Sequence, residues 1–148
     1  MQKLTLLFVL ASLSYVTAYT QCDKKYKLKT ERIVTIKDDG SEGEDLPFTS
    51  DITITKDSIF ILINLPNGST AEVKGKHTET VCKMNADYSE GSIDYKTDTE
   101  LSNQSETRQQ KMTFTLEAKE KKLKLFGVPV DQPGEKICFI IKEKEEIK

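Results

Sequence analysis

A strict alternation of apolar and polar side chains, with a period of two, is the feature that most limits how this chain folds. It is clearest in residues 111–118 and recurs in residues 25–37 and 52–55. Successive side chains of a β-strand point to opposite faces, so this alternation indicates half-buried strands. The apolar positions that concern us most are Ile52 and Ile54 in residues 52–55, and Met112, Phe114 and Leu116 in residues 111–118. No segment shows a comparable helical spacing, and the sequence therefore predicts an all-β protein.

Turn residues divide the rest of the chain into further strands. Residues 59–63 and 137–141 are continuously apolar, which is typical of strands inside a sheet. Asn67-Gly68, the segment 88–91 and Glu120-Lys121 each predict a turn between neighbouring strands. We therefore expect an antiparallel meander of about 8–10 short strands, barrel-like in form, with a β-sandwich as the alternative.

The polar stretches of the sequence are interpreted as connections. Residues 38–45 predict an acidic loop, and residues 98–110 predict the longest loop. Residues 70–78 and 81–86 are expected to form two separate strands. The charged tail, residues 142–148, is expected to fray.

The first residues have the order of a secretory signal. A lysine is followed by an apolar run of about ten residues and then by Val16-Thr17-Ala18. A membrane span requires roughly 20 apolar residues, so this run favours cleavage and predicts no stable membrane span. We expect residues 1–18 to be removed and residues 19–148 to form a single all-β domain, exported to a periplasmic or extracellular space.

Three cysteines, Cys22, Cys82 and Cys138, remain after this cleavage. In an oxidising compartment they predict one disulfide and one remaining thiol, and the sequence does not select the pair. No two of them have the spacing of a zinc or redox motif. Asn67 and Asn103 begin glycosylation sequons, whose use depends on the source of the chain.

Chemical motifs do not indicate an enzyme. His77 is the only histidine and has no accompanying nucleophile motif, so we expect it on the polar face of a strand. The acidic loop lacks the spacing of a calcium-binding EF-hand. The net charge, −2 for the whole chain and −3 without the leader, argues against a nucleic-acid partner. We therefore predict no catalytic residue, no metal ligand and no cofactor.

Three functions are compatible with these observations. The first is a non-enzymatic exported binding module that holds a small apolar ligand, lined by Ile52, Ile54, Met112, Phe114 and Leu116, although the same residues would also make a filled core. A pocket larger than roughly 300 Å³ would favour a carrier. The alternative is a protein-interaction module, an inhibitor or adhesion partner, acting through loop 98–110 or the acidic loop. The third is a hydrolase with two carboxylates.

The order of these segments also resembles a known group of proteins. A signal segment, a lysine-patterned first strand, serial hairpins, the turn Tyr88-Ser89-Glu90-Gly91 and the strand at 112–118 are similar to small exported lipocalin-like β-barrel proteins of Bacteroidetes-type bacteria, mostly uncharacterised. The chain has no tryptophan, so the Gly-x-Trp of true lipocalins is absent. The resemblance implies architecture and compartment, and it does not imply a ligand.

Overall fold

The computed structural model describes residues 22–147, and the expected signal segment, residues 1–18, lies outside this range. The described residues form strands joined by turns, with no helix. The strands are β1 (Lys25–Ile36), β2 (Glu42–Leu46), β3 (Thr49–Ile54), β4 (Ser58–Asn64), β5 (Thr70–Met84), β6 (Gly91–Ser102), β7 (Thr107–Lys119), β8 (Lys122–Pro129) and β9 (Lys136–Ile147).

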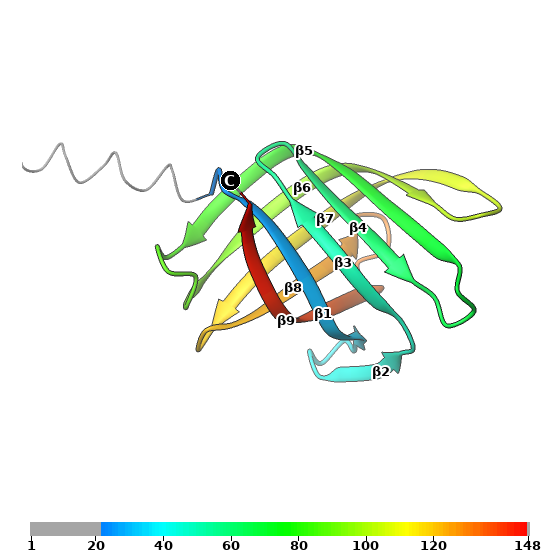
Figure 1. Cartoon of the computed structure of the whole chain (residues 1–148), viewed down its shortest axis with the longest axis horizontal. Helices are drawn as coiled ribbons and strands as arrows, with labels where there is room; N and C mark the ends of the chain where they lie inside the picture. The colour runs from blue at the N-terminus through cyan, green and yellow to red at the C-terminus, as the bar shows by residue number, and fades with distance from the viewer. Residues whose placement is uncertain (1–21, 148) are drawn as a thin grey trace, which may run out of the picture.

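The sheet closes on itself as an antiparallel barrel. Its strand order is β2-β1-β3-β4-β5-β6-β7-β8-β9, and β1 also pairs with β9 from Lys25↔Ile147 to Ile36↔Lys136. Eight strands thus form the wall, and β1 and β9 lie side by side where it closes (Figure 1). This confirms the predicted meander and barrel. Several strands are longer than expected, and β5 has 15 residues.

β2 corrects the prediction of a plain acidic loop. Residues 42–46 pair with β1 next to the segment that pairs with β3, so β2 and β3 share one edge of β1. Arg32 binds both Glu42 and Asp45, with a distance of 3.0 Å to Asp45 Oδ1. Its guanidinium offsets the repulsion between the two acids and allows an acidic segment to pair as a strand.

A bulge in β1 reverses the expected orientation of its second half. Against β9, Thr30 pairs with Ile141 and Arg32 pairs with Ile140, which leaves Glu31 as an extra residue. An extra residue shifts the alternation by one position. Ile33 therefore joins the interior cluster, whereas Val34, which shares the phase of Leu28 in the alternation of residues 25–37, lies outside that cluster.

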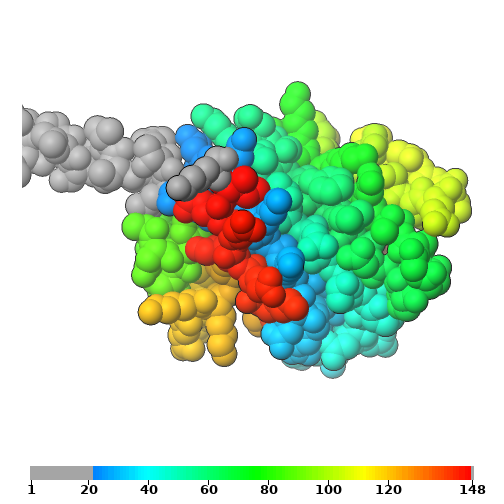
Figure 2. Space-filling model, in the orientation of Figure 1, coloured from blue at the N-terminus to red at the C-terminus, as the bar shows by residue number. Residues whose placement is uncertain are grey.

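The predicted long loop is wrong. β6 continues to Ser102 and β7 begins at Thr107, so the chain turns within residues 103–106, where Asn103 N donates to Glu106 O at 3.0 Å. Backbone ladder hydrogen bonds do not require apolar side chains, and threonines favour extended structure. The resulting β6–β7 hairpin projects beyond the barrel wall (Figures 1 and 2).

Two other boundaries were also predicted wrongly. The segments expected as separate strands form the single strand β5, with an irregularity in pairing between His77 and Glu79. The charged tail remains paired with β1. Its acids form ion pairs with Lys24, just before β1, and with Lys29 of β1, at Lys24–Glu146 (3.1 Å) and Lys29–Glu143 (3.6 Å). Pairing between the two chain ends replaces the expected fraying.

A prediction about the turn between β5 and β6 follows from its glycine. Gly91 has φ of 120°, and a Cβ there would lie 2.3 Å from Lys83 O. Gly91→Ala is therefore expected to lower the free energy of unfolding by about 2 kcal/mol or more in urea denaturation. Gly134→Ala is the control, because nothing lies within 4 Å of the corresponding Cβ. Equal stability of the two variants would contradict this account.

Candidate functional site

One end of the barrel is closed by tyrosines. Tyr88, in the β5–β6 turn, is 4% exposed, and its ring centroid lies 5.0 Å from that of Tyr26. The amino group of Lys144 covers both rings, 4.5 Å from the Tyr88 centroid and 5.5 Å from that of Tyr26. Burial raises the pKa of both hydroxyls above their ordinary value near 10. Two neutral rings under a cation therefore close this end.

A disulfide supports the same closed end. Cys22 and Cys82 are bonded, with 6.2 Å between their Cα atoms, and the bond joins the segment before β1 to the end of β5. The structure thereby decides the pairing that the sequence left open, with Cys138 as the buried thiol. Such a bond is consistent with an oxidising environment.

The opposite end of the barrel contains an apolar pocket with a volume of about 190 Å³. Side chains from β4 to β9 line it, together with one residue of the β8–β9 loop. They are Ile61, Ile63, Val73, Leu101, Arg108, Gln110, Met112, Phe114, Gly127, Pro129, Glu135, Ile137 and Phe139. Apolar side chains form most of this set, as in sites that bind small apolar molecules.

The five residues proposed from the sequence divide between this pocket and the core beneath it. Met112 and Phe114 line the pocket. Ile52, Ile54 and Leu116 do not line it, and each is about 1% exposed within the interior cluster. The interior is thus largely filled by these side chains, and the pocket lies near the open end.

A glycine keeps part of this space open. A Cβ on Gly127 would lie 3.1 Å from Phe114 Cε1 and 3.7 Å from Met112 Cε. A Cβ there would therefore press on Phe114 and make ordinary van der Waals contact with Met112. The sequence analysis missed Gly127, although a glycine inside a strand is a known sign of close approach.

Charged and polar groups stand at the rim of the pocket. Arg108 pairs with Leu101 and Gln110 pairs with Thr99, so their side chains continue the inward series of β7 beyond Met112. The sequence analysis missed both because it assigned them to a loop. Glu135 lines the pocket from the segment just before β9. The pocket therefore combines an apolar interior with a rim that carries both signs of charge.

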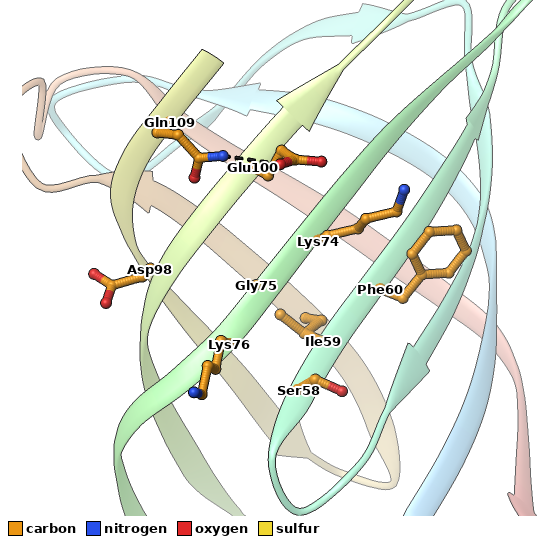
Figure 3. Close-up of a pocket in the computed structure, with 9 residues that line it drawn as sticks. All are labelled: Ser58, Ile59, Phe60, Lys74, Gly75, Lys76, Asp98, Glu100 and Gln109. Carbon is orange, nitrogen blue, oxygen red and sulfur yellow. Dashed lines mark hydrogen bonds between the residues drawn. The ribbon is translucent and has the colours of Figure 1, made fainter. Parts of the chain in front are cut away.

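A second hollow, on the outer face of β4 to β7, differs in character (Figure 3). Its lining includes Phe60 and several charged groups, most of which already have protein partners. Gln109 Nε2 donates to Glu100 at 2.9 Å, and Lys74 pairs with Glu72 at 2.6 Å. The hollow is open to solvent and polar, so the pocket at the barrel end is the stronger candidate for a ligand.

The sequence analysis placed His77 on the polar face of a strand, whereas in the structure its side chain is partly buried. Its ring stacks on Tyr95 at 4.5 Å between centroids, and Nδ1 lies 3.1 Å from Lys56 O. A carbonyl only accepts, so Nδ1 carries the proton and Nε2 is unprotonated. Nε2 is buried without a hydrogen-bond partner among the described residues. Burial lowers the pKa of His77 below 6.5, against smaller opposing effects of Lys56 and Asp57.

Two exposed carboxyl groups have lowered pKa values. The pKa values of Asp39 and Asp87 are lowered by hydrogen bonds from Ser41 and Ser89, which is the reverse of what a general acid needs. Within residues 22–147, no group of three or more histidine, cysteine or acidic side chains is arranged to hold a metal ion. The same residues include no helix long and apolar enough to span a membrane.

No protein-family model, curated protein or solved structure matches the chain at a significant level. The function must therefore be argued from the geometry of the barrel.

The lowered pKa of His77 predicts a specific pH dependence. The unfolded chain binds a proton near pH 6.5 and the folded chain only at lower pH, so the contribution of His77 to stability is lost as the pH falls below about 6.5. We expect the stability of wild type relative to His77→Phe to decrease between pH 8 and 5 in urea denaturation. Carboxylates cancel in this difference, and parallel stability curves would disprove the assignment.

The free thiol is protected on the outer side of the wall. Cys138 is 0% exposed, and burial raises its pKa to about 11. Its outer-face neighbours include Val34 and Phe126, the latter covered by Lys136 at 4.4 Å. Glu42, which binds Lys124 at 3.4 Å, also interacts with the thiol.

This burial predicts slow thiol labelling. Relative to the ordinary pKa of 9.0, a value of about 11 reduces the thiolate population at pH 8 about 100-fold. A chromogenic disulfide reagent should therefore detect no thiol in the native protein and one after denaturation. Glu42→Ala should accelerate native labelling more than Glu44→Ala does. Rapid labelling of the native wild type would show that Cys138 becomes accessible to the reagent readily.

Proposed function

We propose that the chain is an exported, non-enzymatic binding protein that holds a small apolar molecule at the open end of its barrel. The observation that carries this proposal is the asymmetry of the barrel. One end is closed by Tyr26 and Tyr88, and the other contains a largely apolar pocket. A barrel that needed only a filled core would have no reason to keep one end hollow.

The pocket volume limits the size of the ligand. At about 190 Å³ it is smaller than the roughly 300 Å³ at which drug-sized sites begin. An engineered apolar cavity of about 150 Å³ in another protein holds benzene. The matching ligand is therefore a single small ring system or a short branched chain, and a long-chain lipid is too large for the enclosed part.

Export is part of the proposal and rests on two observations of different kinds. The order of residues 1–18 matches a signal peptide. The Cys22–Cys82 disulfide suits the oxidising conditions outside the cytoplasm. A periplasmic and an extracellular location are equally compatible with both.

A second candidate function is recognition of another protein through the projecting β6–β7 hairpin. The observation that favours it is the extent of this hairpin, which stands out from the barrel where a long loop was expected (Figure 2). Exposed hairpin tips held by a rigid scaffold are common contact sites. An empty pocket that rejects every small apolar probe would favour this second function.

The proposal is tested by filling the pocket with a tryptophan. Ile63 and Leu62 are neighbours on β4, and Ile63 lines the pocket whereas Leu62 lines a groove on the outer face. We expect Ile63→Trp to weaken indole binding at least about tenfold in isothermal calorimetry, because the new side chain occupies the ligand's space. Leu62→Trp should bind indole as the wild type does.

Thermal melts of both variants would show whether the barrel remains folded. If Ile63→Trp does not fold, Leu101→Trp blocks the same pocket from β6. Equal binding by wild type and a folded pocket variant would contradict the proposed function.

A further inference from the structure

The rim of the apolar pocket carries one cation and one anion. Arg108 reaches it from β7, and Glu135 reaches it from the segment before β9. Neither side chain forms an ion pair with any residue between 22 and 147. On the outer face, some charged side chains of neighbouring strands pair, as Lys29 does with Glu143.

The two groups reach the pocket from segments that do not pair with each other. Arg108 lies beyond the residues of β7 that pair with β8, and Glu135 precedes β9. Both side chains line the same pocket. The gap between them lies over an apolar pocket, where a ligand's polar end would be placed.

Both charges have unused hydrogen-bonding capacity. A guanidinium offers a planar fork of donors that matches a carboxylate, and a carboxylate accepts from an ammonium group. Gln110, next to Arg108 along the inner face, adds an amide that can donate or accept. A purely anionic ligand would meet Glu135 as a like charge, and a purely cationic ligand would meet Arg108 in the same way.

We propose that the pocket selects apolar molecules with a zwitterionic end, such as a free amino acid with an aromatic or branched side chain. This inference rests on the proposed function. The side chain enters the pocket between Met112, Phe114 and Ile137. The carboxylate of the ligand binds Arg108, and its ammonium group binds Glu135. This arrangement pairs both rim charges and buries the apolar body of the ligand.

The test uses four probes with the same phenyl body and different polar ends. They are L-phenylalanine (zwitterion), 3-phenylpropionate (anion), 2-phenylethylamine (cation) and 3-phenylpropan-1-ol (neutral). Calorimetric titration of the disulfide-bonded protein should show the tightest binding for L-phenylalanine.

Two substitutions then test which rim residue binds each charged group of the ligand. Arg108→Gln should weaken L-phenylalanine and 3-phenylpropionate by about tenfold and leave the alcohol unchanged, since one charged hydrogen-bonded contact at an exposed rim is worth about that much. Glu135→Gln should weaken L-phenylalanine and 2-phenylethylamine to a similar extent. Lys111→Gln, on the outward face of β7, and Asp131→Asn, in the β8–β9 loop, remove the same charges away from the pocket and should change nothing.

The outcomes separate this inference from the function on which it rests. Equal binding of all four probes, unaffected by either rim substitution but reduced by Ile63→Trp, would overturn the zwitterion inference and retain the apolar pocket. Tightest binding of 3-phenylpropionate, with no effect of Glu135→Gln, would overturn it in favour of a simple anion. If no probe binds, including the neutral alcohol, the proposed function itself fails.

Discussion

The structure depends first on the pairing of its two chain ends. β1 and β9 meet along their whole length, and the charged residues of the tail pair with the lysine-rich first strand. Without this ladder the sheet would have two long free edges and no enclosed interior. Closure brings β9 beside β1 and encloses the interior, so that side chains of β4 to β9, such as Ile61 and Ile137, line one pocket. The pocket is therefore a product of closure and not of any one hairpin.

The two ends of the closed barrel differ because different residues reach them. At one end a turn with positive φ at Tyr88 directs an aromatic ring inward, and the disulfide and Lys144 support it from outside. At the other end the inward positions are taken by Leu101, Arg108 and Gly127, which leave space or point to solvent. Buried aromatic rings close one end, whereas a glycine and long flexible side chains leave space at the other.

Charged side chains differ between the outer face of the barrel and the rim of the pocket. Most ion pairs lie between neighbouring strands on the outer face, where solvent screens them and each contributes little to stability. Arg32 has a larger structural role, because it binds both Glu42 and Asp45 and so holds β2 beside β1. Glu42 also interacts electrostatically with the thiol of Cys138. Arg108 and Glu135 form none of these pairs and lie at the rim of the apolar pocket within the barrel.

The sequence by itself determined the class of fold and much of its register. The alternation in residues 111–118 and the turns at Asn67-Gly68 and Glu120-Lys121 predicted an antiparallel meander, because period-two burial and positive-φ turns are local properties of the backbone. Tertiary structure alone decided the rest. The bulge at Glu31, the pairing of Cys22 with Cys82 and the union of the polar tail with β1 each depend on residues distant in the chain. Arg108 and Gln110 were assigned to a loop because their polarity hid an inward orientation, which only the ladder between β6 and β7 imposes.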